Sequence, residues 1–193
     1  MKILVLLCCM LLLIACTGGI DVNPFFIKTS DGIKISANFY PAESDKGIIL
    51  LHMLDRDKND WQEFIPMLEH RGYNVISIDM RGHGMSELDW QSMSGIELGR
   101  AVLDVDAART YLEEKGVTRF GVVGASIGAN IALKHASQDT SIKSIVLLSP
   151  SLNYRNVETT ENIAVYDRAL FVSASKDDFS SVDDSLTLYA TAI

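Results

Sequence analysis

Gly124-Ala125-Ser126-Ile127-Gly128 is the stretch that decides the fold, because a strand pattern ends just before it and a helix pattern begins inside it. Residues 119–123 are an apolar run typical of a buried strand, and residues 127–133 are the small and apolar residues of a closely packed helix. The two glycines allow a strained strand-to-helix turn, on which the hydroxyl of Ser126 projects above the sheet. The stretch therefore predicts a site for acyl transfer at this serine.

The N-terminus has the pattern of an export signal. An uncharged apolar run over residues 3–14 follows Lys2, and it is shorter than the about 17 to 25 residues of a spanning helix. We therefore predict a signal peptide over residues 1–15. Leu13-Ile14-Ala15-Cys16 resembles the lipobox of prokaryotic lipoproteins, which implies cleavage before Cys16, lipid on that cysteine and anchoring of the exported protein to the cell membrane. An ordinary secretory leader or an uncleaved anchor is the alternative.

Composition and charge limit the number of domains, the disulfides and the kinds of binding partner that we expect. Residues 16–24 are expected to form the lipidated N-terminus and a tether, and residues 25–193 to form one domain. All three cysteines lie at or before Cys16, so this domain has no internal disulfide. The formal net charge of −8 becomes more negative when Lys2 is removed with the leader. This charge argues against binding to nucleic acid and against a basic membrane-binding patch.

The order of apolar runs predicts an α/β fold. Residues 25–29 and 34–40 flank Asp31-Gly32, which predicts a hairpin between two opening strands. Five runs follow that are apolar on both faces, as in strands of a buried parallel sheet: residues 47–51, 75–78, 120–123, 144–148 and 169–172. Alternation of these runs with helices predicts a mostly parallel, doubly wound sheet, whose ligands bind beyond the carboxyl ends of the strands.

Helices with one apolar face are expected between these runs. The first covers residues 61–68, whose apolar positions recur at i, i+3, i+4 and i+7. Asp60 and Glu63 are spaced as a capping pair at its start, and Gly72 ends it. The second covers residues 98–112, with another apolar stripe. Helices of this kind cover the two faces of the sheet.

Four segments, taken in order, carry a family resemblance. They are Leu51-His52-Met53-Leu54, Asp79-Met80-Arg81-Gly82-His83-Gly84-Met85-Ser86, Gly124 to Gly128, and Lys176-Asp177-Asp178. They resemble the oxyanion segment, the loop after the fourth strand, the nucleophile elbow and the acid-bearing turn of the α/β-hydrolase family. The resemblance covers about residues 25–193. Met53 departs from it, because glycine is usual at this position.

The resemblance implies a role for each residue type. Ser126 is the expected nucleophile, and the backbone amides of Ile127 and Leu54 are the expected oxyanion donors. Asp178 is the first choice for the acid that orients a histidine, and Asp177 is the alternative. A solvated turn is the structural interpretation of either aspartate. The resemblance implies no cofactor and no metal, and it implies a small-molecule acyl substrate.

The expected catalytic histidine is missing from its place in the chain order. In this family it follows the acid, but the four histidines are His52, His70, His83 and His135. His70 and His135 are expected at the surface. His83 is expected to be a structural loop residue, and the family uses the position of His52 to shape the oxyanion loop.

Two interpretations follow. The first is an exported, lipid-anchored serine hydrolase of the esterase type, whose chain is truncated and lacks the last strand and helix. The second is a non-catalytic, decayed or binding member that keeps the elbow but not the base. In either case the run at residues 169–172 is expected at the edge of the sheet, unpaired unless residues 180–193 shield it.

Overall fold

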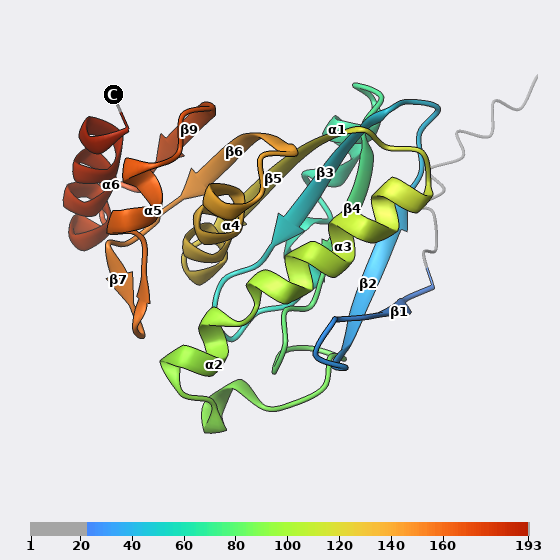
Figure 1. Ribbon diagram of the computed structural model, residues 1–193, viewed down its shortest axis with the longest axis horizontal. Helices are drawn as coiled ribbons and strands as arrows, with labels where there is room; N and C mark the ends of the chain where they lie inside the picture. Colours follow the sequence, from blue (N-terminus) through green and yellow to red (C-terminus); the bar gives the residue numbers. More distant parts are fainter. Residues whose placement is uncertain (1–22, 193) are drawn as a thin grey trace, which may run out of the picture.

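The computed structural model describes residues 23–192. The predicted signal peptide and Cys16 lie outside the described residues. Within them, no helix is both long and apolar enough to cross a bilayer. Figure 1 shows one twisted sheet with helices along it, and the helix α6 (Phe179–Thr191) packed at the end formed by the last strand.

Seven strands form this sheet in the order β1-β2-β4-β3-β5-β6-β9. Their bounds are β1 Phe25–Lys28, β2 Lys34–Tyr40, β3 Lys46–Leu51, β4 Asn74–Ile78, β5 Arg119–Ala125, β6 Ile142–Leu148 and β9 Ala169–Ser173. β1 and β2 form the predicted hairpin, turning at Gly32 with a φ of +91°. β2 pairs antiparallel with β4, and the five strands from β4 to β9 are parallel. The predicted α/β fold is therefore confirmed.

The parallel strands bury side chains on both faces of the sheet. On one face, Ile49, Ile76 and Val122 pack in a cluster with α3 (Val102–Glu114) and α4 (Ile127–Gln138). On the opposite face, Leu50 and Val123 pack with residues of η1 (Lys58–Trp61) and α1 (Ile65–Glu69). Successive residues of a strand point to opposite faces, which is why these runs are apolar throughout.

The first predicted helix, over residues 61–68, is wrong in its extent and its cap. The segment forms the 3₁₀ turn η1 and then the five-residue helix α1, which has a proline in its first turn. Because Pro66 has no N–H and restricts the residue before it, the α-helix begins only at Ile65. Asp57, and not Asp60 with Glu63, supplies the side-chain cap of η1.

The second predicted helix is present but divided. The short helix α2 (Gly95–Gly99) ends at Gly99, with Arg100 as its C-cap, and α3 begins at Val102. Leu98, Val105, Ala108 and Leu112 of the predicted stripe are all buried. The smaller elements are η2 Trp90–Ser92, β7 Asn153–Tyr154, β8 Val157–Glu158 and α5 Thr160–Ala164.

The last strand differs from the prediction of a run buried on both faces. β9 pairs only with β6 and forms an edge of the sheet as far as the structure describes it, which confirms the expected edge position of residues 169–172. Its residues alternate between exposed and half-buried, and Phe171 is 59% exposed. α6 contacts β9, but its residues cover one face of the strand and add no strand at its edge.

Candidate active site

Ser126 lies on a strained turn between β5 and α4. Its φ of 51° and ψ of −119° are a conformation that residues with a Cβ rarely adopt. Its N–H donates to the carbonyl of Leu148 at 2.8 Å, so the turn is fixed to the end of the neighbouring strand β6. The hydroxyl of Ser126 makes no hydrogen bond within residues 23–192 and is left for another partner.

Gly124 and Gly128 lie where backbone segments approach too closely to leave room for a Cβ atom. A Cβ at Gly128 would lie 2.6 Å from the carbonyl oxygens of both Leu51 and His52. A Cβ at Gly124 would collide with the carbonyl of Gly128. The start of α4 is therefore pressed against the end of β3, which brings the segment after β3 beside Ser126.

Two backbone amides, one at the start of α4 and one in the segment after β3, have no acceptor. Ile127 is the first residue of α4, and its N–H cannot bond within the helix. Leu54 follows β3 in an irregular segment, and its N–H has no acceptor either among residues 23–192. These are the two amides that the sequence assigned to oxyanion binding, and both are free to donate.

His52 is fixed in a neutral, buried form. Its Nδ1 lies 2.6 Å from the carbonyl oxygen of Met53, and its Nε2 accepts from the N–H of Met80 at 3.0 Å. These two contacts require the tautomer that carries its proton on Nδ1. Burial also lowers the pKa of His52 to about 4. With both nitrogens engaged, His52 has no lone pair to accept a proton from Ser126.

His83 is also buried, in the loop that follows β4. Its Nδ1 lies 3.0 Å from the carbonyl oxygen of Arg81, and its ring stacks on Trp90 at 5.9 Å between centroids. Burial lowers the pKa of His83. These contacts fit the structural interpretation of this histidine.

The remaining two histidines, His70 and His135, differ in their exposure to solvent. His70 is exposed, as predicted, just after α1. The prediction for His135 is wrong, because its relative exposure is only 6%. α4 packs against the sheet, α3 and α5, so even its last turn has little contact with solvent. Within residues 23–192, no histidine makes a hydrogen bond to Ser126 or to Asp178.

Asp178 is the N-cap residue of α6. Its carboxylate accepts from the N–H of Ser181 at 3.3 Å and from the hydroxyl of Ser180 at 3.2 Å. These hydrogen bonds hold the pKa of Asp178 below its ordinary value. The neighbouring Asp177 is exposed. Both aspartates follow β9, separated from the end of β5 by strand β6.

Ion pairs of a buried arginine hold the loop that follows β4. Arg81 binds Asp104 through Nε at 2.9 Å and Nη2 at 2.7 Å, and it binds Asp31 through Nη1 at 2.9 Å. Arg81 is 3% exposed and Asp104 is fully buried. The pair fixes the loop after β4 to α3, because Asp104 also accepts from the backbone N–H of Arg81 at 2.8 Å.

A cavity of about 500 Å³ opens beside the turn. Ala125, which precedes Ser126, and Leu148, which accepts its N–H, both line it. Its other wall comes from the segment after β3 and from η1, including Met53, Arg56 and Trp61. The sequence marked Trp61 only as a helix core residue. Nothing in the local pattern showed that it would also line a cavity.

Known proteins similar to this chain share its fold. A family model described as alpha/beta hydrolase fold matches residues 47–179. A serine hydrolase-like protein of Dictyostelium discoideum is 30% identical over 126 residues, which are 63% of this chain and 33% of that protein. Bifunctional epoxide hydrolase 2 of Rattus norvegicus is 26% identical over 157 residues, which are 78% of this chain and 27% of that protein. The chain spans about a third or less of the length of these two relatives.

Solved structures agree on the architecture. An esterase of Pyrococcus furiosus has a TM-score of 0.77 and 22% identity to this chain, and the match covers 89% of this chain and 78% of the esterase. At this identity, the likeness extends to the arrangement of the strands and helices.

Proposed function

The chain belongs to the α/β-hydrolase fold family, and from this premise we propose that it is a serine hydrolase of carboxyl esters or related small acyl compounds, with Ser126 as the nucleophile. The observation that carries the proposal is the strained backbone of Ser126, with the free N–H of Ile127 next to it and the free N–H of Leu54 in the segment after β3. Strain of about 1–3 kcal/mol persists only where the surrounding structure maintains it, and it is concentrated at functional sites.

The chemistry of this site follows from its free groups. The hydroxyl oxygen of Ser126 attacks the carbonyl carbon of the substrate, and a base takes the hydroxyl proton. The carbonyl oxygen becomes an oxyanion, to which the N–H groups of Ile127 and Leu54 donate. Collapse of this intermediate expels the alcohol with the proton from the base, and water then releases the acid by the same steps. The cavity lined by Met53 and Trp61 accommodates part of the substrate.

The base is the part of the proposal that these residues do not provide. His52 has both ring nitrogens engaged, and Asp178 caps a helix with no histidine bound to it. This favours a second candidate function, a non-catalytic member that binds acyl compounds at the elbow. A translation of the DNA beyond codon 193 that gives a strand followed by a histidine would favour the hydrolase.

Labelling with a fluorophosphonate probe tests the nucleophile. With the base present, we expect the probe to label the protein and Ser126→Ala to abolish the label. Ser149→Ala is the matched control, because Ser149 also directly follows a strand and has a positive φ of 48°. Labelling that survives in Ser126→Ala would contradict the assignment. A folded protein that resists the probe but binds an acyl ligand would favour the non-catalytic alternative.

We also propose that the protein is exported and anchored by lipid on Cys16. The support is the sequence pattern alone, an uncharged leader that ends in Ala15-Cys16. We expect Cys16→Ala to move the protein from the membrane fraction to the soluble exported fraction, whereas Cys9→Ala should not. Unchanged partition of Cys16→Ala would contradict the proposal.

A further inference from the structure

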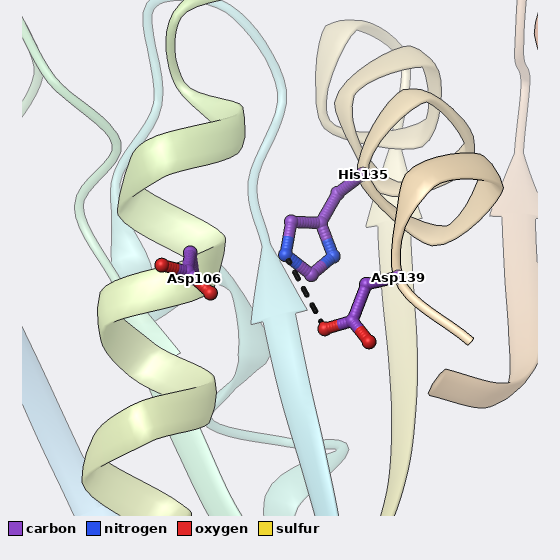
Figure 2. Close-up of side chains that lie close together, drawn as sticks. All are labelled: Asp106, His135 and Asp139. Atoms are coloured by element: carbon purple, nitrogen blue, oxygen red, sulfur yellow. Dashed lines mark ion pairs between the residues drawn. The ribbon is translucent and has the colours of Figure 1, made fainter. Parts of the chain in front are cut away.

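Three potential metal ligands converge between two helices, far from the elbow. Asp106 lies on α3, and His135 and Asp139 lie at the end of α4 (Figure 2). One ligand atom from each residue lies within 4.8 Å of the others. At a rise of about 1.5 Å per helical residue, His135 is about 13 Å along α4 from Ser126. The cluster is therefore separate from the proposed active site.

His135 is the part of this cluster that points to a ligand. Its side chain is 7% exposed, and its Nδ1 is buried without a hydrogen-bond partner. Its Nε2 faces Asp139 Oδ2 at 4.0 Å, which is too long for a hydrogen bond (Figure 2). Buried imidazoles are ordinarily hydrogen-bonded, but neither nitrogen of this ring has a hydrogen bond among the described residues. Nε2 is the nitrogen that faces the carboxylates, so it is the one that a metal ion would bind.

The two carboxylates each present an oxygen toward this space. Asp139 accepts from the N–H of Ser141 through Oδ1 at 2.8 Å, which fixes the carboxylate and directs Oδ2 toward His135. Asp106 Oδ1 accepts only from Arg109, at 3.1 Å. Two carboxylates and one neutral imidazole form a ligand set that suits Zn²⁺.

In this structure, the guanidinium of Arg109 is the positive charge that faces Asp106 and Asp139. Its Nε lies 3.0 Å from Asp139 Oδ2 but is not aligned for a hydrogen bond, because this buried N–H has no hydrogen-bond partner. Its Nη1 donates to Glu113 at 3.0 Å on the solvent side of the same helix. The guanidinium can therefore release the two aspartates and keep Glu113 as its partner.

We propose that Asp106, His135 and Asp139 form a binding site for a divalent transition-metal ion, with Zn²⁺ as the best match, that links α3 to α4. Zn²⁺ binds these ligand types at about 2.0–2.2 Å, so the three side chains must close by an ångström or two from their present separation. Binding displaces Arg109 from both aspartates. The fourth ligand is water, since two of the three residues are partly exposed.

Calorimetric titration of the chelator-treated full chain with Zn²⁺ tests the site. We expect one equivalent to bind, and His135→Gln and Asp139→Asn each to weaken binding by at least about 10–100-fold, since loss of a supporting partner alone costs this much. The control is His70→Gln, which removes an exposed histidine and should not change the affinity. Two ligand variants are used so that a failure of one to fold leaves the other informative. Absence of saturable binding, or equal affinity in the ligand variants, would overturn the proposal.

Arg109→Met tests the exchange of cations. Methionine keeps an apolar stem beside the ring of Phe120 but removes the competing charge. We expect this variant to bind Zn²⁺ at least tenfold more tightly than the unaltered chain. Weaker binding of Zn²⁺ by this variant would show that Arg109 supports the site, and it would contradict the proposal that Zn²⁺ displaces Arg109 from the two aspartates. None of these measurements uses Ser126, so their outcome is independent of the hydrolase proposal.

Discussion

Nζ of Lys58 lies 2.6 Å from Oδ2 of Asp79 inside the protein, where the lysine side chain is 4% exposed and the aspartate is fully buried. The carboxylate also accepts from the backbone N–H groups of Lys58 at 2.7 Å and Met85 at 2.9 Å. Asp79 thus joins the segment after β3, which carries Leu54, to the loop after β4. This buried pair therefore ties the segment that carries the proposed oxyanion donor to the loop after β4.

A double-mutant cycle tests whether the side chains of Lys58 and Asp79 are coupled. Asp79→Asn leaves the Lys58 charge buried without its partner, and we expect it to lower the free energy of unfolding by about 3–5 kcal/mol. Lys58→Met leaves the carboxylate with its two backbone donors, so we expect a smaller loss. The double variant should lose less than the sum of the two, as urea denaturation would measure. Additive losses would show that the two side chains are not coupled.

Two helical glycines differ in the space beside them, which allows a controlled test of packing at the elbow. Gly128 faces the carbonyls of Leu51 and His52, so we expect Gly128→Ala to lower stability by about 1–3 kcal/mol through overpacking. A Cβ at Gly99 in α2 would meet only the end of Lys134, at 3.8 Å. Gly99→Ala should therefore raise stability by about 0.5–1 kcal/mol. Similar effects of both substitutions would contradict the close contact between β3 and α4.

The buried histidine after β3 should make stability depend on pH. Burial lowers the pKa of His52 from 6.5 to about 4, so between these values the unfolded chain binds a proton that the folded chain does not. The contribution is complete above pH 6.5 and is lost as the pH falls toward 4, with a change of about 3 kcal/mol. In His52→Gln, the free energy of unfolding should fall less steeply between pH 7 and pH 4.5.

His70→Gln is the control for this pH series. The ring of His70 is exposed, so its removal should leave the slope unchanged. Part of the slope should remain in His52→Gln, because burial lowers the pKa of His83 and His135 as well. If His52→Gln and the unaltered chain gave the same slope, His52 would not be buried in its neutral form.

The parallel strands and the elbow were predictable because their signals are local. Apolar runs such as residues 47–51 form strands wherever they lie in the sheet, and Gly124 to Gly128 adopts its turn through its own steric freedom. The position of a strand within the sheet is a property of the whole topology. The apolar pattern at residues 169–172 alone therefore predicted a strand buried on both faces, whereas the expected edge position, which the structure confirms, came from the strand order of the family that the chain resembles.

At the candidate sites, too, local features were predictable and features that depend on the whole topology were not. The motif predicted that Ser126 and Ile127 are neighbours, but neither the cavity wall at Trp61 nor the burial of His135 follows from adjacent residues. Both depend on which helix packs where. One signal could have indicated the second cluster, namely the spacing of four residues between His135 and Asp139, which places them on the same helical face.

The exposed edge of β9 has an apolar residue at its centre. Leu170 and Val172 pack toward the core, whereas Phe171 points the other way and is 59% exposed. The strand pairs with β6 on one side, and the N–H and C=O groups of its other side have no strand partner within residues 23–192. An edge of this kind is a template for pairing with another chain.

We therefore predict that the chain without residues 1–15 associates as its concentration rises, through β9. Phe171→Lys should reduce this association, because a charged residue at an edge opposes strand pairing between chains. Ile96→Lys is the matched control: it makes the same change of charge at an 80% exposed position on α2, which is not part of the sheet. Light scattering over a series of concentrations gives the mass of the associated species. If the unaltered chain stayed monomeric at every concentration, α6 would protect β9 well enough to prevent pairing. If Ile96→Lys reduced association as much as Phe171→Lys, general charge repulsion would explain the result instead of strand pairing at the edge.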